Sequence, residues 1–358
     1  MCRRLQNILF IISFYISFST LNAQASVFEP PPGSKISADS VIAAIERGEA
    51  VWIHKCEILG PLIKRGTPER LDTIKNIINI SSSNIDDSIF FSDCFFMSPV
   101  VFAIATFKGV VNFSQVTFSK QAIFVFCTFK KHALFQASTF CSNTHFYHTT
   151  FGGDANFSYS TFSGQVDLGQ IEFEDIYISW KQLEDHLIYD TRANLKLMKY
   201  FDETRKLDDA DGVYLFLKNR ERMEKSWYIR YSEYYLIQLT CGYGVKPQNT
   251  LYLSIFFILL FAVMYTKTGA LRARNQDFAL QRSLRTAMRK ISFYHALYFS
   301  LQTFIIGVVP EWYPTEQYLI KIRKFKLFKF KTLAMIEGAL GWILVILFII
   351  SLGKKFIR

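Results

Sequence analysis

Apolar residues recur along the middle of this 358-residue chain in steps that alternate between five and six positions. The series is unbroken and comprises Ile80, Ile85, Phe91, Phe96, Phe102, Phe107, Phe113, Phe118, Phe124, Phe129, Phe135, Phe140, Phe146, Phe151, Phe157, Phe162, Leu168 and Phe173. Two residues before each ring the residue is small or β-branched, as at Ala105, Val111 and Ala133. A helix cannot return such residues to one face, and a single strand would alternate every two positions. The pattern predicts a coil that turns a corner about every five residues and points one ring and one small residue inward at each side.

This pattern resembles the pentapeptide-repeat family in its Phe-centred form, over about residues 80–173. Blocks such as Val111-Asn112-Phe113-Ser114 and Ala155-Asn156-Phe157-Ser158 carry the resemblance. It implies a right-handed quadrilateral β-helix, in which 22 residues make one coil and about four coils stack at roughly 4.8 Å each. The outward Ser, Thr, Asn and Gln residues suit a solvated face or a protein contact. The stretch has four Lys against six Asp or Glu, which is too weakly acidic to mimic duplex DNA.

The cysteines and histidines do not form a pattern typical of a metal site. The six cysteines include no CxxC pair, and Cys94 and Cys127 occupy the same inward repeat position, which favours buried thiols over a disulfide. His132, His145 and His148 do not recur in register. The chain also lacks GxSxG, P-loop, HExxH and dinucleotide-binding motifs. We therefore expect no enzymatic activity, no cofactor and no metal.

The N-terminus has the features of an export signal. Arg3 and Arg4 precede an apolar core at Ile8–Phe18, and Ala23-Gln24-Ala25 supplies a small-x-small cleavage site. We predict a signal peptide over residues 1–25, with an uncleaved N-terminal anchor as the alternative. Residues 26–79 are expected to form a capping segment that includes an amphipathic helix at Val41–Arg47.

The net charge of +11 belongs entirely to the chain beyond Phe173, where 28 Lys and Arg face 17 Asp and Glu. Most of these charges border apolar runs, which favours a membrane surface over nucleic acid. Residues 174–247 have the apolar spacing of helices, and Asp208-Asp209 could cap one of them. Aromatic and basic residues mix around Trp227–Tyr235, which suits an interfacial helix, although a plain amphipathic linker has the same pattern. The alternation of basic and apolar residues over Lys321–Lys331 likewise suits anionic lipid headgroups.

Two segments, Asn249–Thr266 and Thr332–Gly353, are apolar and long enough to cross a bilayer. Between them, Ser292–Gly307 is too short to cross and return as two helices, which favours a short re-entrant helix followed by extended chain. This arrangement resembles the two-transmembrane potassium-channel-like domain, over residues 248–358. The resemblance makes Ala296–Leu301 a pore helix and Ile336–Trp342 part of a pore-lining helix.

The resemblance implies a filter near Gly307, but the sequence departs from the family there. Ile305-Ile306-Gly307-Val308-Val309-Pro310 lacks the threonine and the second glycine on which potassium filters depend, so potassium selectivity does not carry over. The candidate filter residues are Thr303, Ile305, Ile306, Gly307, Val308 and Glu311. Glu311 could form a cation-attracting ring in a four-fold assembly, or lie at the interface. Glu337 and Gly341 are the candidates in the pore-lining helix, with local pairing of Glu337 to Lys or Arg as the alternative.

Together these features predict a homotetrameric ion channel, conducting cations, in the inner (plasma) membrane. Thirteen Lys or Arg between residues 267 and 331 assign the pore-loop side to the cytoplasm and the repeat domain to the exported side, the reverse of potassium channels. The expected partners are permeant ions, lipid and a protein on the β-helix, and no nucleic acid. The alternative is a membrane-anchored scaffold with a closed, degenerate pore.

Overall fold

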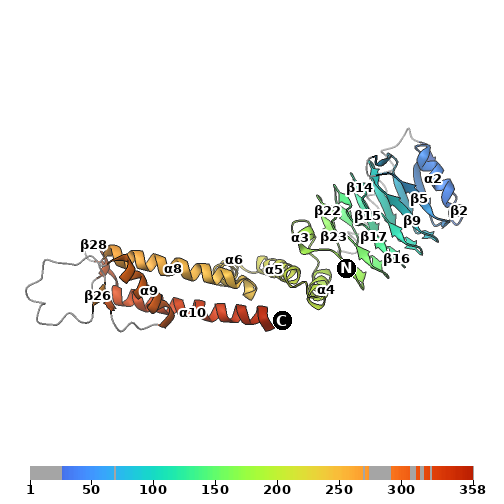
Figure 1. Cartoon of the computed structure of the whole chain (residues 1–358). Coiled ribbons are helices and arrows are strands. Elements are labelled where there is room, and N and C mark those ends of the chain that lie inside the picture. Colours follow the sequence, from blue (N-terminus) through green and yellow to red (C-terminus); the bar gives the residue numbers. More distant parts are fainter. Residues whose placement is uncertain are drawn as a thin grey trace, which may run out of the picture. The chain divides into compact units, whose positions relative to one another are not determined.

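The computed structural model describes residues 26–67, 70–268, 271–273, 292–306, 312–314, 318–322 and 325–357. The chain divides into two compact units, Met1–Leu217 and Lys218–Arg358 (Figure 1). The first is a β-solenoid with helices at its ends, and the second is helical. The signal peptide predicted over residues 1–25 lies outside the described residues.

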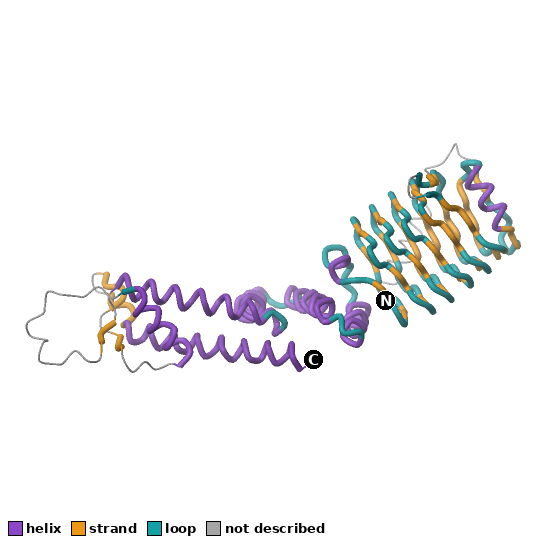
Figure 2. The backbone as a smooth tube through the Cα atoms, viewed as in Figure 1, coloured by secondary structure: helices purple, strands orange, loops and turns teal. Residues whose placement is uncertain are grey.

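The solenoid is built from four parallel sheets, whose strands follow one another around each coil (Figure 2). One sheet contains β1 (Val27–Phe28), β3 (Ala50–His54), β7 (Ile78–Ser81), β11 (Val100–Ala103), β15 (Ala122–Val125), β19 (Thr144–His145) and β23 (Val166–Asp167). The second contains β2 (Lys35–Ser37), β4 (Glu57–Leu59), β8 (Asn84–Ile85), β12 (Thr106–Phe107), β16 (Thr128–Phe129), β20 (Thr150–Phe151) and β24 (Glu172–Phe173). The third contains β5 (Leu62–Arg65), β9 (Ile89–Ser92), β13 (Val111–Asn112), β17 (Ala133–Leu134), β21 (Ala155–Asn156) and β25 (Ile176–Tyr177). The fourth contains β6 (Asp72–Ile74), β10 (Cys94–Phe96), β14 (Thr117–Phe118), β18 (Thr139–Phe140) and β22 (Thr161–Phe162).

The solenoid is longer than the repeat predicted. Within the repeat, each residue pairs with the residue 22 positions later, as Phe102 does with Phe124. Two of the sheets contain seven strands, so the solenoid has about seven turns instead of four. Residues 26–79, expected as a capping segment, contribute β1 to β6 and the start of β7 to the same four sheets. One of these early coils is longer, since Ile53 pairs with Ile80.

The inward rings form four stacked columns, one for each side of the coil. In one column Phe96, Phe118, Phe140 and Phe162 stack at centroid distances of 5.2, 5.0 and 5.0 Å. The other three columns run through Phe102–Phe124–Phe146, Phe107–Phe129–Phe151 and Phe91–Phe113–Phe135–Phe157. All eighteen predicted ring positions are buried. Stacked pairs of this kind contribute about 0.5–1.5 kcal/mol each beyond their buried area.

The small residues before the rings are also buried, and their polar members bond to the neighbouring coil. The hydroxyls of Ser138 and Ser160 donate to the carbonyls of Phe113 and Phe135, at 2.5 and 2.6 Å. Thr149 donates to the Phe124 carbonyl in the same way, and the Cys127 thiol to the Phe102 carbonyl at 3.3 Å. These bonds satisfy polar groups that would otherwise be buried without a partner.

Every eleventh residue from Ser82 to Gln170 turns a corner in the left-handed conformation, although none of these residues is glycine. They are Ser82, Asp93, Ile104, Gln115, Phe126, Ala137, His148, Tyr159 and Gln170, with φ between 50° and 62°. Each stands two residues after one of the inward apolar residues of the repeat. A side chain in this conformation costs roughly 1–2 kcal/mol. The stacked coils therefore maintain a turn that these residues do not favour by themselves.

Helices close both ends of the solenoid. Helix α2 (Ala38–Glu46) confirms the helix predicted there; it is capped by Ser37, and its Val41 and Ile45 join the solenoid core. At the other end α3 (Trp180–Leu183), α4 (Thr191–Glu203) and α5 (Leu207–Met223) bury Leu183, Leu197 and Val213 against the same core.

Helix α3 also supplies hydrogen bonds to the open edge of the solenoid. The Gln182 amide donates to the carbonyls of Phe157 and Ser160, at 2.9 and 2.7 Å. The Asp209 carboxylate, in the first turn of α5, accepts the Trp180 N–H at 2.8 Å. Asp209 therefore caps the start of α3 from another helix, and the linker expected over 174–247 divides at Leu217 between the two units.

The second unit is described by itself. It contains α6 (Trp227–Glu233), a π-helical turn η1 (Tyr234–Gln238), α7 (Leu239–Cys241), the turn η2 (Gly242–Gly244), α8 (Pro247–Thr268), α9 (Phe293–Ile306) and α10 (Phe330–Ile357). Short antiparallel pairs join β26 (Leu271–Ala273) to β27 (Trp312–Pro314) and β28 (Tyr318–Ile322) to β29 (Phe325–Lys329).

The left-handed corners generate a first prediction. Tyr159 has a φ of 62° and is 82% exposed, so its side chain contributes little packing. Tyr159→Gly relieves the backbone strain, whereas Lys120→Gly, at an exposed position with a negative φ, only adds unfolded-state entropy. In denaturant unfolding of the full chain, we expect the two variants to differ by about 1–2 kcal/mol, with Tyr159→Gly the more stable. Equal stabilities would contradict the strain at this corner.

The buried thiols generate a second prediction. Burial raises the pKa of both Cys94 and Cys127 to about 12, so almost none of either thiol is ionised at pH 8. Cys141 is exposed. We expect iodoacetamide at pH 8 to modify Cys141 in the folded protein and to leave Cys94 and Cys127 unmodified until denaturant is added, as read by peptide mass spectrometry. Modification of Cys127 at the rate of Cys141 would show that the ring columns open readily.

Candidate functional site

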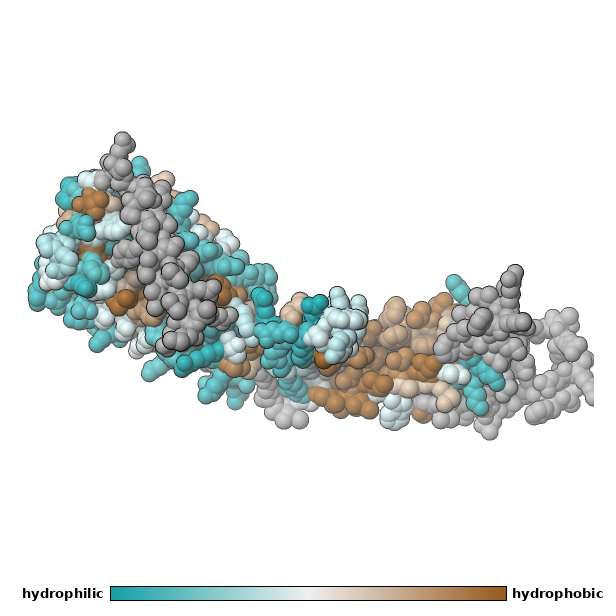
Figure 3. Space-filling model, turned by 180° about the vertical axis from the view of Figure 1, so that it is seen from behind, coloured by the Kyte–Doolittle hydropathy of each residue, from teal (hydrophilic) through white to brown (hydrophobic). Residues whose placement is uncertain are grey.

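Helices α8 and α10 are each long and apolar enough to cross a membrane. The exposed apolar side chains of α10 are Met335, Ile336, Trp342, Ile343, Ile346, Ile349 and Ile350. Those of α8 are Leu251, Tyr252, Ile255, Phe256, Leu259, Leu260 and Val263. The surface of this unit is accordingly apolar over the two helices, and the solenoid surface is mostly polar (Figure 3). An exposed apolar surface of this kind is typical of contact with lipid or with other subunits.

The shorter helix α9 packs against both long helices and brings polar groups into their interface. Its buried residues are Ala296, Phe299, Ser300, Thr303 and Phe304. The Phe299 ring meets the Tyr265 ring of α8 edge to face, at 5.2 Å between centroids. The Ser300 hydroxyl lies 2.9 Å from the Ile258 carbonyl of α8. The short helix is thus held by side-chain packing and by a hydrogen bond.

Glu337 of α10 is fully buried at the centre of this three-helix contact. The Tyr265 hydroxyl is hydrogen-bonded to one carboxyl oxygen at 2.7 Å, and the Ser300 hydroxyl is hydrogen-bonded to the other. The expected alternative was an ion pair with Lys or Arg, but the partners within the described part of the chain are hydroxyls. The Glu337 carboxyl of α10 therefore joins one residue of each of the other two helices, Tyr265 of α8 and Ser300 of α9.

Gly341, one turn beyond Glu337, lies in close contact with the backbone of α9. A Cβ atom at this position would lie 2.0 Å from the Phe304 carbonyl oxygen of α9. Only a residue without a side chain lets α9 approach α10 this closely.

The predicted filter residues are only partly within the described residues. Thr303 is buried in α9, and its hydroxyl has no hydrogen-bond partner among the described residues. Ile305 and Ile306 end the helix and are 53% and 61% exposed. Gly307, Val308 and Glu311 lie outside the described residues. Thr303 therefore belongs to the helix interface, whereas Ile305 and Ile306 belong to the exposed end of α9.

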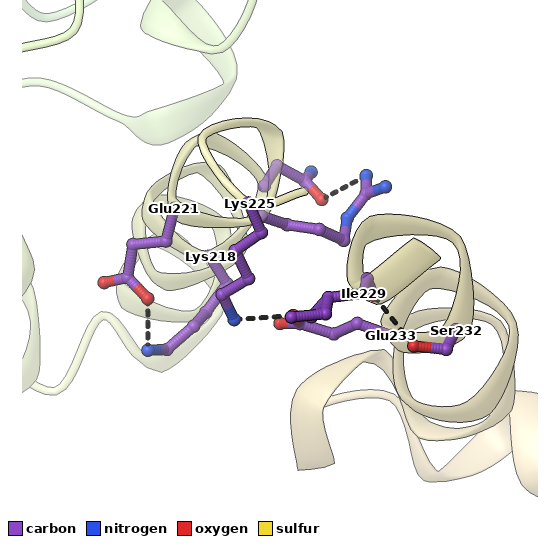
Figure 4. A network of polar contacts seen from close by, with 8 residues as sticks. Lys218, Glu221, Lys225, Ile229, Ser232 and Glu233 are labelled. Atoms are coloured by element: carbon purple, nitrogen blue, oxygen red, sulfur yellow. Dashed lines mark hydrogen bonds and ion pairs between the residues drawn. The ribbon is translucent and has the colours of Figure 1, made fainter. Parts of the chain in front are cut away.

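The segment before α8 combines ion pairs with exposed aromatic residues. Lys218 pairs with Glu221 at 2.7 Å within α5, and Lys225, just after α5, pairs with Glu233 of α6 at 2.6 Å (Figure 4). The hydrogen bond from Lys225 lowers the pKa of Glu233 below its usual range. No residue of α6 is buried, and Trp227 is 69% exposed. The predicted interfacial segment thus forms a short helix with its aromatic side chains at the surface.

The turn between α7 and α8 contacts the far end of α10. Gly242, Tyr243 and Gly244 have φ values of 54°, 55° and 86°, so the chain makes a left-handed turn there. The Lys354 ammonium lies 3.4 Å from the Tyr243 carbonyl. The start of α8 and the end of α10 are therefore joined.

Comparison with known protein families identifies the repeats of the solenoid. Residues 113–161 match the family described as Pentapeptide repeats (9 copies). The solenoid is a pentapeptide-repeat domain. No potassium-channel family matches the helical unit, and neither a curated protein nor a solved structure matches the chain.

Two residues of the carboxyl cluster were not predicted as site residues. Tyr265 stands in an apolar helix, where the sequence alone does not indicate which face is buried. Ser300 lies in the predicted pore helix, but nothing marked its hydroxyl as a partner of Glu337. The sequence did contain one indication of this cluster, a polar residue in each of three apolar segments. Polar side chains in apolar helices tend to hydrogen-bond to one another, because no water is available to them. Within the described residues, no group of His, Cys, Asp and Glu could hold a metal ion.

The contact at Gly341 generates a third prediction. We expect Gly341→Ala to separate α9 from α10 and to lower the free energy of unfolding of the helical unit by about 1–3 kcal/mol, because the new methyl group meets a backbone oxygen. Ala339→Leu, on the exposed face of the same turn, is the matched control and should leave stability unchanged. Thermal unfolding of the full chain in detergent, followed by circular dichroism, measures both. Unchanged stability in Gly341→Ala would contradict the close packing.

Proposed function

We propose that the helical unit assembles as a homotetramer and forms a cation-conducting pore whose filter differs from that of potassium channels. The observation that carries this proposal is the short helix α9, packed between two helices that could span a membrane and held by Ser300–Glu337 and Phe304–Gly341. A short helix fixed in this way resembles the pore helix of two-transmembrane channels. The exposed apolar faces of α8 and α10 supply surface for neighbouring subunits and lipid.

The proposal assigns the pore entrance to the end of α9 and to the residues that follow it in sequence. Ile305 and Ile306 would line it together with Gly307 and Val308, and four copies of Glu311 would attract cations. Backbone carbonyls and carboxylate rings are the usual means of cation selection. The missing threonine and second glycine argue against strict preference for potassium.

The remaining parts of the chain would support this pore. Exposed Trp227, Tyr228 and Tyr231 of α6, with Arg230 among them, suit the headgroup region of a bilayer. The distribution of Lys and Arg favours the inner membrane with the repeat domain exported. The pentapeptide-repeat domain would then serve for sensing or assembly on the exported side.

Ion flux tests the proposal, and it is our fourth prediction. The full chain, reconstituted in liposomes, should be tetrameric and pass cations in preference to chloride when potassium, sodium, calcium and chloride gradients are applied separately. Glu311→Gln should weaken the preference for cations, because it removes the carboxylate ring, and Gly307→Ala should change the order among cations. Glu184→Gln, an exposed carboxylate of the solenoid unit, is the matched control and should conduct like the wild type.

Silence under every gradient, in a folded and oligomeric protein, would favour the anchored scaffold. That alternative predicts that substitutions on the solenoid surface abolish function while Gly307→Ala does not.

A further inference from the structure

If Glu337 is ionised, its cluster has one more hydrogen-bond contact than it has hydrogens to donate. Three contacts exist, between Tyr265 and Glu337, between Ser300 and Glu337, and between Ser300 and the Ile258 carbonyl. Tyr265 and Ser300 have one hydroxyl hydrogen each, and the Ile258 carbonyl can only accept. With an ionised Glu337, two hydrogens would serve three contacts.

A protonated carboxyl removes this shortage. Glu337 then donates its own hydrogen to Ser300, Ser300 donates to the Ile258 carbonyl, and Tyr265 donates to the second carboxyl oxygen. Each oxygen pair has one hydrogen, and the chain of bonds runs from α8 through α10 and α9 back to α8. Such connected hydrogen bonds reinforce one another in a buried, apolar setting.

The surroundings of the carboxyl also oppose a negative charge. Glu337 has no exposed surface, and Tyr265 is the only titratable group that contacts it among the described residues. The other titratable side chains of the three helices are at least partly exposed, namely Tyr252 and Lys267 on α8, Tyr294, His295 and Tyr298 on α9, and Lys331, Lys354 and Lys355 on α10. A buried carboxylate without a cation costs several kcal/mol.

We infer that Glu337 is a neutral carboxylic acid in the folded protein and acts as a positioning residue that ties α9 to α8 and α10. This inference is independent of conduction, because it concerns how the three helices are held together. A neutral cluster lets this part of the chain enter an apolar environment without carrying a charge into it.

Infrared spectroscopy of the full chain in detergent tests the inference, and it is our fifth prediction. At pH 7 exposed carboxylates are ionised, so a C=O stretching band of a carboxylic acid should appear and be absent in Glu337→Gln. Glutamine is nearly isosteric and offers one donor and one acceptor group, so this variant should stay folded. The control Glu233→Gln removes a carboxylate that is paired with Lys225 and should leave the band in place.

Two further variants assign the hydrogen bonds. Tyr265→Phe should keep the band but move it to higher frequency, since the carbonyl oxygen loses its donor. Raising the pH from 5 to 8 should lower the unfolding midpoint of the wild type by roughly 5–10 °C more than that of Glu337→Gln, because the folded wild type keeps a proton on Glu337 that the unfolded chain releases. Identical spectra of the folded wild type and Glu337→Gln, or identical pH dependence of their midpoints, would overturn the inference.

Discussion

The stacking of phenylalanine rings at a spacing of 22 residues is the interaction on which the solenoid depends. Rings within a column stack on the ring of the next coil on both sides, so a change in coil length would break four columns at once. The corners illustrate this dependence, since Phe126 and Tyr159 adopt a left-handed conformation that an isolated chain would avoid. The energy of the stacks is what keeps these residues there. The small inward residues serve the same end, because a larger side chain at Ser138 or Ala155 would separate adjacent coils.

The coils with stacked phenylalanine rings could be predicted from the sequence because phenylalanine recurs there at a regular spacing. The early coils were not predicted, for an identifiable physical reason. Isoleucine replaces phenylalanine at Ile53 and Ile58, helix α2 interrupts the first coil, and five additional residues lengthen the next one. The pairing of parallel strands tolerates such insertions, because a loop can leave the coil at a corner without changing the register of the strands. A pattern based on spacing is lost at the first insertion, although the sheets continue.

In the helical unit, the sequence predicted the helices but not the contacts between them. Apolar length was enough to find α8 and α10, and the intervening stretch gave α9. In segments where nearly every residue is apolar, however, the 3.6-residue period does not indicate which face is buried. Glu337 stood out because a carboxyl group in an apolar helix is costly, but its partners Tyr265 and Ser300 became evident only from the packing. The close contact between Gly341 and the Phe304 carbonyl likewise became evident only from the packing.

Both units contain polar groups that are buried in an apolar interior and hydrogen-bonded there. In the solenoid, Ser160 donates to the carbonyl of Phe135 in the neighbouring coil. In the helical unit, the Ser300 hydroxyl contacts the carbonyl of Ile258 in the neighbouring helix. The same hydroxyl is hydrogen-bonded to Glu337 of the third helix, α10. Because the carboxyl needs both hydroxyls, it fixes which face of α10 points inward. The opposite face, with Ile343 and Ile350, is thereby left as a continuous apolar surface. The buried polar cluster thus determines which surface of α10 is exposed.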